Sequence, residues 1–213
     1  MRSYRFVSSI HFTGMNVKFR LAQPTDAAAI LAIYAPYCES SHVSFEVSAP
    51  SERRMRDRIA RIAVQYPWLI AEVDGTVGGY VYASQHGERA AYRWAVDVAI
   101  YVAAAQQRKG MARALYDSLF AILRQQGYFK ACAGITLPNP ASVGLHETLG
   151  FRRLGIFPGV GYKLGRWLDV GWWQLDLQPE AANPPEPRPF REICDHRAVS
   201  AALEAGQCQM RAR

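Results

Sequence analysis

Six residues, Gln107-Arg108-Lys109-Gly110-Met111-Ala112, connect a β-rich run at 92–102 to an amphipathic helix. Apolar residues recur three and four positions apart from Met111 to Leu123, and Gln125-Gln126-Gly127 predicts where the helix ends. A strand that passes through a glycine turn into a helix presents free backbone N–H groups and the positive end of the helix dipole. That arrangement favours a bound phosphate group.

The spacing of this segment excludes two common phosphate motifs. It is neither G-x-x-x-x-G-K-[ST] nor G-x-G-x-x-G, so neither a nucleotide-hydrolysing loop nor a dinucleotide fingerprint is indicated. Gly110 would let the backbone approach an anion closely, and Arg108, Lys109 and Arg113 add positive charge around it. Taken alone, the segment is also compatible with a plain turn between a strand and a helix.

The elements on both sides predict a mixed α/β fold. Before the segment we expect a strand at 17–21, helices after Pro24 and Ser51, and strands at 68–73, 76–84 and 92–102. Asp74-Gly75 joins two of these strands and predicts an antiparallel hairpin. After the segment we expect a strand at 131–137, a short helix capped by Asn139-Pro140 and closed by Gly150, and a final strand at 170–177. Antiparallel strands followed by alternating strands and helices form a layered α/β domain.

The domain is expected to span 15–178. Residues 1–14 read as an N-terminal extension that is disordered or non-native, because Met15 is a second possible start just before the first strand. Five prolines between Pro179 and Pro189 disrupt regular structure, so 179–213 reads as a Pro-rich tail, with a short helix at 197–205 as an option.

Charge and composition exclude several classes of protein. The chain has 213 residues and a net charge of +7, but residues 1–20 hold four basic and no acidic residues and residues 188–213 hold five basic against three acidic. A basic excess confined to the ends argues against a nucleic-acid groove. The four cysteines form no C-x-x-C pair, which indicates no zinc site and fits the cytoplasm. No apolar run is long enough to span a membrane.

Several further motifs resemble one acetyltransferase family. The segment at 107–112 resembles the Q/R-x-x-G-x-G/A motif of the GNAT N-acetyltransferase superfamily, and 139–151 resembles its second helix. Tyr66-Pro67-Trp68-Leu69, Leu137-Pro138-Asn139 and the run Asp169 to Gln174 are similar to phosphinothricin N-acetyltransferases. The resemblance covers roughly 17–178.

This resemblance implies a mostly antiparallel sheet, flanked by helices and splayed at an acetyl-CoA site. It also implies a homodimer, no metal, and direct attack of an amine on the thioester in a ternary complex. The residues that it assigns to acetyl-CoA are Ile100, Tyr101, Val102, Gln107, Arg108, Lys109, Gly110, Met111, Ala112, Arg113 and Asn139.

Two side chains are candidate catalytic groups. Asp97 lies within the apolar run 94–100, where burial of a carboxylate is costly unless it has a partner or a task. Phosphinothricin acetyltransferases usually carry Glu there, so Asp97 is one methylene short and a bridging water is expected; a purely structural Asp97 is the alternative. His146 matches a family histidine that would protonate the thiolate or accept from the amine, and it is otherwise an ordinary helix residue.

The resemblance also implies a substrate pocket. Arg89 would hold an acidic group of the substrate, and Phe45 and Tyr92 would wall the cleft; each could instead be rim packing. We therefore expect an acetyl-CoA-dependent N-acetyltransferase that acts on the α-amino group of phosphinothricin, methionine sulfoximine or methionine sulfone. Two alternatives stay open. One is another acceptor, such as a polyamine, aminoglycoside or protein N-terminus, and the other is a non-catalytic acyl-CoA-binding regulator.

Overall fold

The computed structural model describes residues 16–211. Its strands are β1 (Val17–Leu21), β2 (Trp68–Val73), β3 (Thr76–Gln85), β4 (Ala95–Val102), β5 (Lys130–Leu137), β6 (Arg152–Lys163) and β7 (Arg166–Asp176). Its α-helices are α1 (Ala27–Glu39), α2 (Glu52–Gln65), α3 (Met111–Gln126), α4 (Pro140–Thr148) and α5 (Arg197–Arg211). The expected extension at 1–14 lies outside the described residues.

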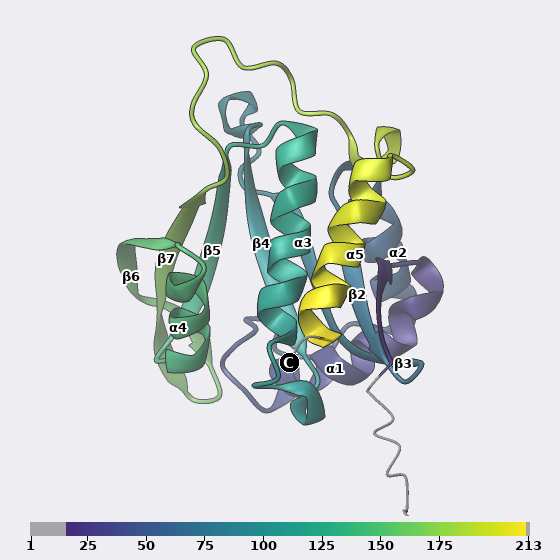
Figure 1. Ribbon diagram of the computed structural model, residues 1–213. Helices are drawn as coiled ribbons and strands as arrows, with labels where there is room; N and C mark the ends of the chain where they lie inside the picture. The colour runs from purple at the N-terminus through teal and green to yellow at the C-terminus, as the bar shows by residue number, and fades with distance from the viewer. Residues whose placement is uncertain (1–15, 212–213) are drawn as a thin grey trace, which may run out of the picture.

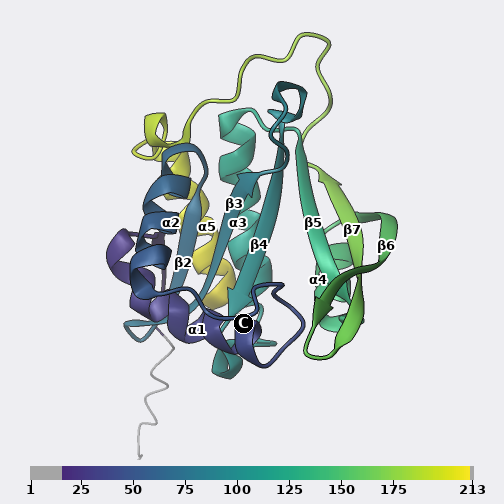
Figure 2. The same cartoon turned by 180° about the vertical axis from the view of Figure 1, so that it is seen from behind.

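One seven-stranded sheet runs through the molecule in the order β1-β2-β3-β4-β5-β7-β6. Only β4 and β5 are parallel neighbours; the other pairs are antiparallel. Helices α3 and α5 cover one face (Figure 1), and α1 and α2 cover the other (Figure 2). The predicted fold class, a mostly antiparallel sheet flanked by helices, is confirmed.

Local sequence signals set several element boundaries. Asp74 and Gly75 adopt positive φ angles of 50° and 79° at the β2–β3 turn, as the hairpin signal predicts. Gly127 ends α3 in the left-handed region, at φ 94°, and Asn139 caps α4 by accepting from the Ser142 N–H at 3.1 Å. The final strand is longer than expected, because β7 begins at Arg166 rather than at residue 170.

Two neighbouring strands separate in the middle of the sheet. β4 and β5 pair only from Ala95 to Asp97 and from Lys130 to Cys132, although both strands continue for several residues. Beyond that point the backbone N–H and C=O groups of β4 that face β5 lose their strand partner. The predicted splay is therefore present, and it opens the sheet next to the start of α3.

Strand β6 was not predicted from the sequence. Gly155, Pro158, Gly159 and Gly161 interrupt its alternation, and its register with β7 shifts twice. Nine of its twelve residues are exposed, so no apolar face marks it in the sequence. Pairing with β7 is what makes this segment a strand.

The last segment differs from the expected tail. After the Pro-rich stretch, Phe190 and Ile193 are buried, and α5 packs against α3 and β1. Val199, Ala202 and Met210 place buried side chains on one helical face. The prolines break regular structure only over 179–189, and the chain then returns to the core. None of the helices over 16–211 is long and apolar enough to cross a membrane.

Candidate active site

A cleft of about 70 Å³ lies where β4 and β5 separate. Ile100 and Tyr101 of β4, Gly134 of β5, and Asn139 and His146 of α4 line it. The cleft therefore brings together residues that the sequence placed in separate motifs. Its walls are strand backbone on two sides and a helix on the third, which suits an extended ligand arm inserted between the strands.

The loop before α3 has the geometry of an anion site. Arg108 and Gly110 both adopt left-handed conformations, at φ 62° and 84°. The first helical hydrogen bond runs from the Ala114 N–H to the Gly110 carbonyl at 3.1 Å, so the N–H groups of residues 111–113 precede the helical ladder. Arg108, Lys109 and Arg113 are exposed around this helix start. Dipole, N–H groups and cations together fit a pyrophosphate.

Val102, Gln107 and Met111, which the sequence analysis assigned to acetyl-CoA, also make contacts within the protein. The Gln107 amide donates to the Tyr37 hydroxyl at 3.1 Å, and that hydroxyl donates to the Val102 carbonyl at 2.9 Å. Met111 is 1% exposed and packs against the glycine pair at 78–79 of β3. Any contact that Met111 makes with a phosphate would therefore come from its backbone N–H, while Gln107 holds the loop against α1.

His146 is 4% exposed, and both of its ring nitrogens are engaged. Nδ1 lies 2.8 Å from the Ser142 carbonyl, which only accepts, so Nδ1 carries the proton. Nε2 then accepts from the Tyr116 hydroxyl at 3.0 Å. Burial lowers the pKa of His146, which favours this neutral form. His146 and Tyr116 therefore form a hydrogen-bonded pair that lines the cleft.

Asp97 points to the opposite face of the sheet from the α3 core, because its neighbours Val96 and Val98 are buried in that core. Its carboxylate Oδ1 lies 2.7 Å from Nδ1 of His86. Burial raises the pKa of Asp97, and the bond to His86 opposes that rise. Asp97 therefore has a side-chain partner, an imidazole that the sequence analysis did not single out. The expected catalytic role of Asp97 stays a prediction.

Cys132 lies beside this pair, in register with Asp97 across the β4–β5 boundary. Ligand atoms of His86, Asp97 and Cys132 all lie within 4.8 Å of one another, the one such group of three found among residues 16–211. Burial and the Asp97 charge raise the pKa of the Cys132 thiol to about 11. Since the thiolate is the nucleophile, this thiol is poorly suited to nucleophilic attack at neutral pH.

Aromatic rings enclose the His86 side chain. Tyr92 and Trp172 meet its ring edge-on, with centroids 5.7 and 6.0 Å away. Trp172 pairs with Gly134 of β5, and its ring lies over that glycine. The Trp172 Nε1 is buried and has no hydrogen-bond partner over residues 16–211. Tyr92 thus flanks the Asp97–His86 pair, and its role as a wall of the substrate pocket stays a prediction.

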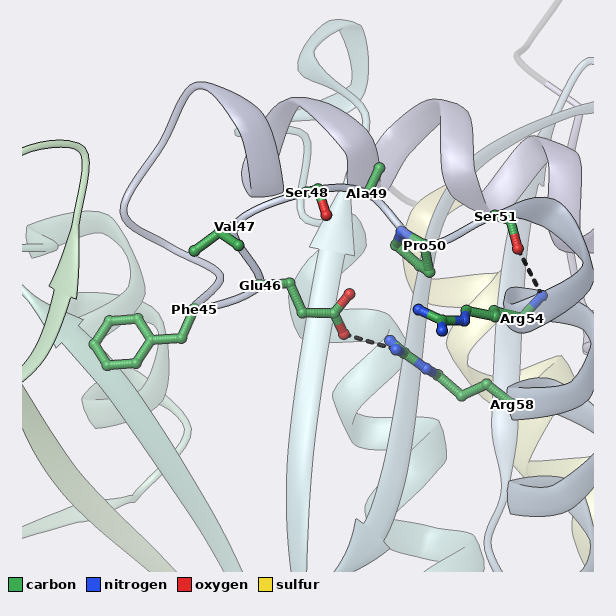
Figure 3. Close-up of a pocket in the computed structure, with 9 residues that line it drawn as sticks. All are labelled: Phe45, Glu46, Val47, Ser48, Ala49, Pro50, Ser51, Arg54 and Arg58. Carbon is green, nitrogen blue, oxygen red and sulfur yellow. Dashed lines mark hydrogen bonds and ion pairs between the residues drawn. The ribbon is translucent and has the colours of Figure 1, made fainter.

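Arg89 and Phe45 lie in different hollows. Arg89 is exposed and lines a separate cavity of about 400 Å³ with Tyr66 and Tyr92. In Figure 3, Phe45 points away from Arg54 and from the Glu46–Arg58 ion pair of 2.7 Å. Tyr92 lines the Arg89 cavity and also flanks His86. The Tyr92 side chain therefore connects that cavity to the Asp97–His86 pair.

A buried lysine ties the loop at 40–45 to the β6–β7 hairpin. Lys163 is 4% exposed, and its ammonium donates to the Ser44 carbonyl at 2.6 Å and to the Tyr37 carbonyl at 3.3 Å. The Phe45 ring packs over Gly161, where a Cβ would overlap it. These contacts bridge the opening between β4 and β5. Sequence reasoning missed Lys163, Tyr116 and His86, because each acts through a contact distant in the chain.

Comparisons with known proteins agree with this geometry. A family model described as an acetyltransferase (GNAT) domain matches residues 19–172. The chain belongs to the GNAT acetyltransferase family. The phosphinothricin N-acetyltransferase of Streptomyces viridochromogenes is 40% identical over 177 residues, which cover 83% of this chain and 94% of that protein.

Two further relatives extend the comparison. The L-methionine sulfoximine/L-methionine sulfone acetyltransferase of Salmonella typhimurium is 35% identical, covering 76% of this chain and 96% of that protein. The phosphinothricin acetyltransferase of Sinorhizobium meliloti, solved in complex with acetyl-CoA, matches with a TM-score of 0.76 and 34% identity, covering 80% of this chain and 94% of that one. The chain is therefore an N-acetyltransferase.

Proposed function

We propose that this protein transfers the acetyl group of acetyl-CoA to the α-amino group of a small amino acid analogue of the phosphinothricin, methionine sulfoximine or methionine sulfone type. The observation that carries the proposal is the Asp97–His86 pair at the point where β4 and β5 separate. A proton acceptor there directly precedes Val98, the first β4 residue that lines the cleft. The names of the relatives support this substrate class.

Direct attack in a ternary complex fits the site better than an acyl-enzyme. The nearest thiol, Cys132, has a pKa of about 11 and stays protonated at neutral pH. The β4 backbone beyond Asp97 has N–H groups released from strand pairing, and these would polarise the thioester carbonyl. Holding amine and thioester together supplies an effective molarity on the order of 10⁵ M or more.

The departing thiolate needs a proton, and the buried pair of Tyr116 and His146 borders the same cleft. Because both nitrogens of His146 are engaged, we propose that the Tyr116 hydroxyl releases its bond to Nε2 of His146 and gives its proton to the sulfur. Direct protonation of sulfur by His146, which the sequence analysis expected, would require a second proton on the imidazole ring. Burial of the ring disfavours that charged form.

The acidic end of the substrate needs donors. Arg89, an exposed guanidinium beside Tyr92, is one candidate, and the unpartnered Trp172 N–H beside His86 is another. Phe45 would close the pocket from the side of β6. Cationic acceptors such as polyamines are less suited to a pocket rimmed by Arg89, and a non-catalytic acyl-CoA-binding regulator would not need the Asp97–His86 pair.

A panel assay tests this proposal. Purified protein is incubated with acetyl-CoA and phosphinothricin, methionine sulfoximine, methionine sulfone, spermidine, an aminoglycoside or an N-terminal peptide, and release of free thiol is followed. We expect kcat/KM for at least one amino acid analogue to exceed that for every cationic acceptor. A preference for a polyamine or peptide would replace the substrate class, and binding of acetyl-CoA without any turnover would favour the regulator.

A further inference from the structure

We infer that His86, held by Asp97, is the group that takes the proton from the substrate amine, and that Asp97 is its positioning residue. The inference rests on the proposed function and names the base within it. It departs from the expectation that Asp97 itself acts, directly or through a water.

The hydrogen bond between the two side chains determines the tautomer of His86. An ionised carboxylate only accepts, so the 2.7 Å contact between Oδ1 of Asp97 and Nδ1 of His86 places the proton on Nδ1. Nε2 then carries the lone pair. Within residues 16–211, no protein group hydrogen-bonds this Nε2. The free lone pair is on the far side of the ring from the carboxylate.

The position of His86 compensates for the short side chain of Asp97. Asp97 pairs with Ser84 across β3–β4, and His86 follows directly after β3 ends at Gln85. The imidazole therefore extends from the carboxylate by the width of one ring. The His86 side chain is 26% exposed, and the edge-on contacts with Tyr92 and Trp172 hold the plane of its ring. A base that is both oriented and solvent-accessible fits proton abstraction.

The charge balance also favours this assignment. Proton uptake by Asp97 alone would neutralise the carboxylate that holds Nδ1 of His86. Uptake by His86 instead creates an imidazolium next to a carboxylate, an ion pair in a partly buried site. Asp97 would stabilise this cation without changing its own protonation, as the acid of a carboxylate–histidine–nucleophile triad does.

The reaction removes two protons from the substrate nitrogen. Nε2 of His86 takes the first from the substrate ammonium, and the freed amine lone pair forms a bond to the thioester carbonyl carbon. The carbon–sulfur bond then breaks, and its electron pair leaves with sulfur. The thiolate takes the hydroxyl proton of Tyr116, and the second proton of the new amide nitrogen restores that hydroxyl. The imidazolium returns its proton to solvent, so the net products are the acetamide, the free thiol and one proton.

Three variants test the assignment kinetically. His86→Ala removes the base, His86→Gln keeps a donor to Asp97 without an imidazole, and Asp97→Ala removes the positioning carboxylate. The acceptor is the amine with the highest kcat/KM in the panel. We expect both His86 variants to lower kcat/KM for that amine by about 10² to 10⁴, the usual contribution of a general base. Free imidazole should restore part of the rate in His86→Ala but not in Asp97→Ala.

The pair should also behave as a unit. Because Asp97 acts through His86, the double variant should be no slower than His86→Ala alone. His196→Ala, at an exposed histidine before α5, is the matched control and should keep wild-type rates. Acetyl-CoA dissociation constants, measured separately, should stay within about twofold of the wild-type value in all variants. That limit corresponds to a change of about 0.4 kcal/mol in binding free energy. Unchanged rates with a chelator present exclude a metal held by His86, Asp97 and Cys132.

A measurement that needs no turnover completes the test. In ¹⁵N spectra of histidine-labelled protein, His86 should show a protonated Nδ1 and an unprotonated Nε2, and Asp97→Ala should abolish that preference. The opposite tautomer, or near wild-type kcat/KM in His86→Ala, overturns the inference. If the wild type acetylates no amine of the panel, the proposed function fails, while the spectra still decide how His86 is held.

Discussion

At the scale of single residues, Gly110 illustrates how a backbone angle carries function. Its φ of 84° places it in the left-handed region, directly before the N–H groups at the start of α3. A β-branched residue resists that angle and projects a side chain near the expected pyrophosphate. Gly127 has φ 94° at the other end of the same helix, away from the loop at 107–110.

We predict that Gly110→Val raises the KM for acetyl-CoA about tenfold or more and changes the amine KM little. The reason is the loss of a hydrogen bond from the backbone to the expected pyrophosphate, because a charge-assisted hydrogen bond is worth about 1.5–3 kcal/mol. Gly127→Val is the matched control, because it brings the same kind of strain to the same helix without touching the anion site. Initial rates over a matrix of both substrates give the two constants. Equal rises in both KM values, or the same rise in Gly127→Val, would contradict the assignment.

At the scale of elements, α5 approaches α3 closely through Gly206. A Cβ built at Gly206 would lie 2.9 Å from the Ala114 carbonyl and would also overlap the Ser118 hydroxyl. That hydroxyl donates to the Ala202 carbonyl at 2.8 Å, so the two helices are joined by a buried polar contact. Gly144, in α4, has open space where its Cβ would be.

We predict opposite effects for the same substitution in these two helices. Gly206→Ala should lower the free energy of unfolding by about 1–3 kcal/mol, because an extra carbon is forced into a packed interface. Gly144→Ala should raise it by about 0.5–1 kcal/mol, the usual gain in an open helix. Urea unfolding followed by circular dichroism measures both. A stabilised Gly206→Ala would mean that α5 is not docked on α3 as described.

At the scale of the whole molecule, the β6–β7 hairpin presents an exposed apolar surface at one end of the sheet. Its large exposed side chains are Leu154, Ile156, Phe157, Val160, Tyr162, Leu164 and Trp167. β6 is the outermost strand, so its outer backbone edge is also unpaired within the described chain. Such a surface, next to an open strand edge, is what an interface between identical subunits covers. We propose that the protein is a homodimer through this hairpin.

The predicted mass in solution is twice 23.8 kDa. Trp167→Glu should yield monomers. Trp167 is 69% exposed in the single chain, and dimerisation would bury the carboxylate charge that the substitution introduces. Val47→Glu, at a 74% exposed valine on the loop before α2, is the control and should leave the mass unchanged. Light scattering after gel filtration reads the mass. A wild-type mass of 23.8 kDa at micromolar concentration would refute the dimer.

Local chemistry in the sequence was sufficient to predict much of the fold. Asp74-Gly75 specifies its turn, Asn139-Pro140 starts its helix and Gly127 ends one, because each depends on the conformational preferences of adjacent residues. The segment at 107–112 likewise predicts a helix start suited to an anion. The apolar run around residue 97 indicates a carboxylate with a partner, since an isolated buried charge is too costly.

Only the tertiary structure decided the contacts between segments far apart in the chain. β6 exists through its pairing with β7, and α5 is docked because α3 and β1 offer an apolar face, which neither segment reveals alone. Tyr116 meets His146 across 30 residues and Lys163 reaches Ser44 across 119. The sequence alone indicated acetyl transfer, through its resemblance to one family, and a helix start that is suited to an anion. Which imidazole faces Asp97 was decided by packing, because hydrogen bonds and burial depend on distance in space rather than along the chain.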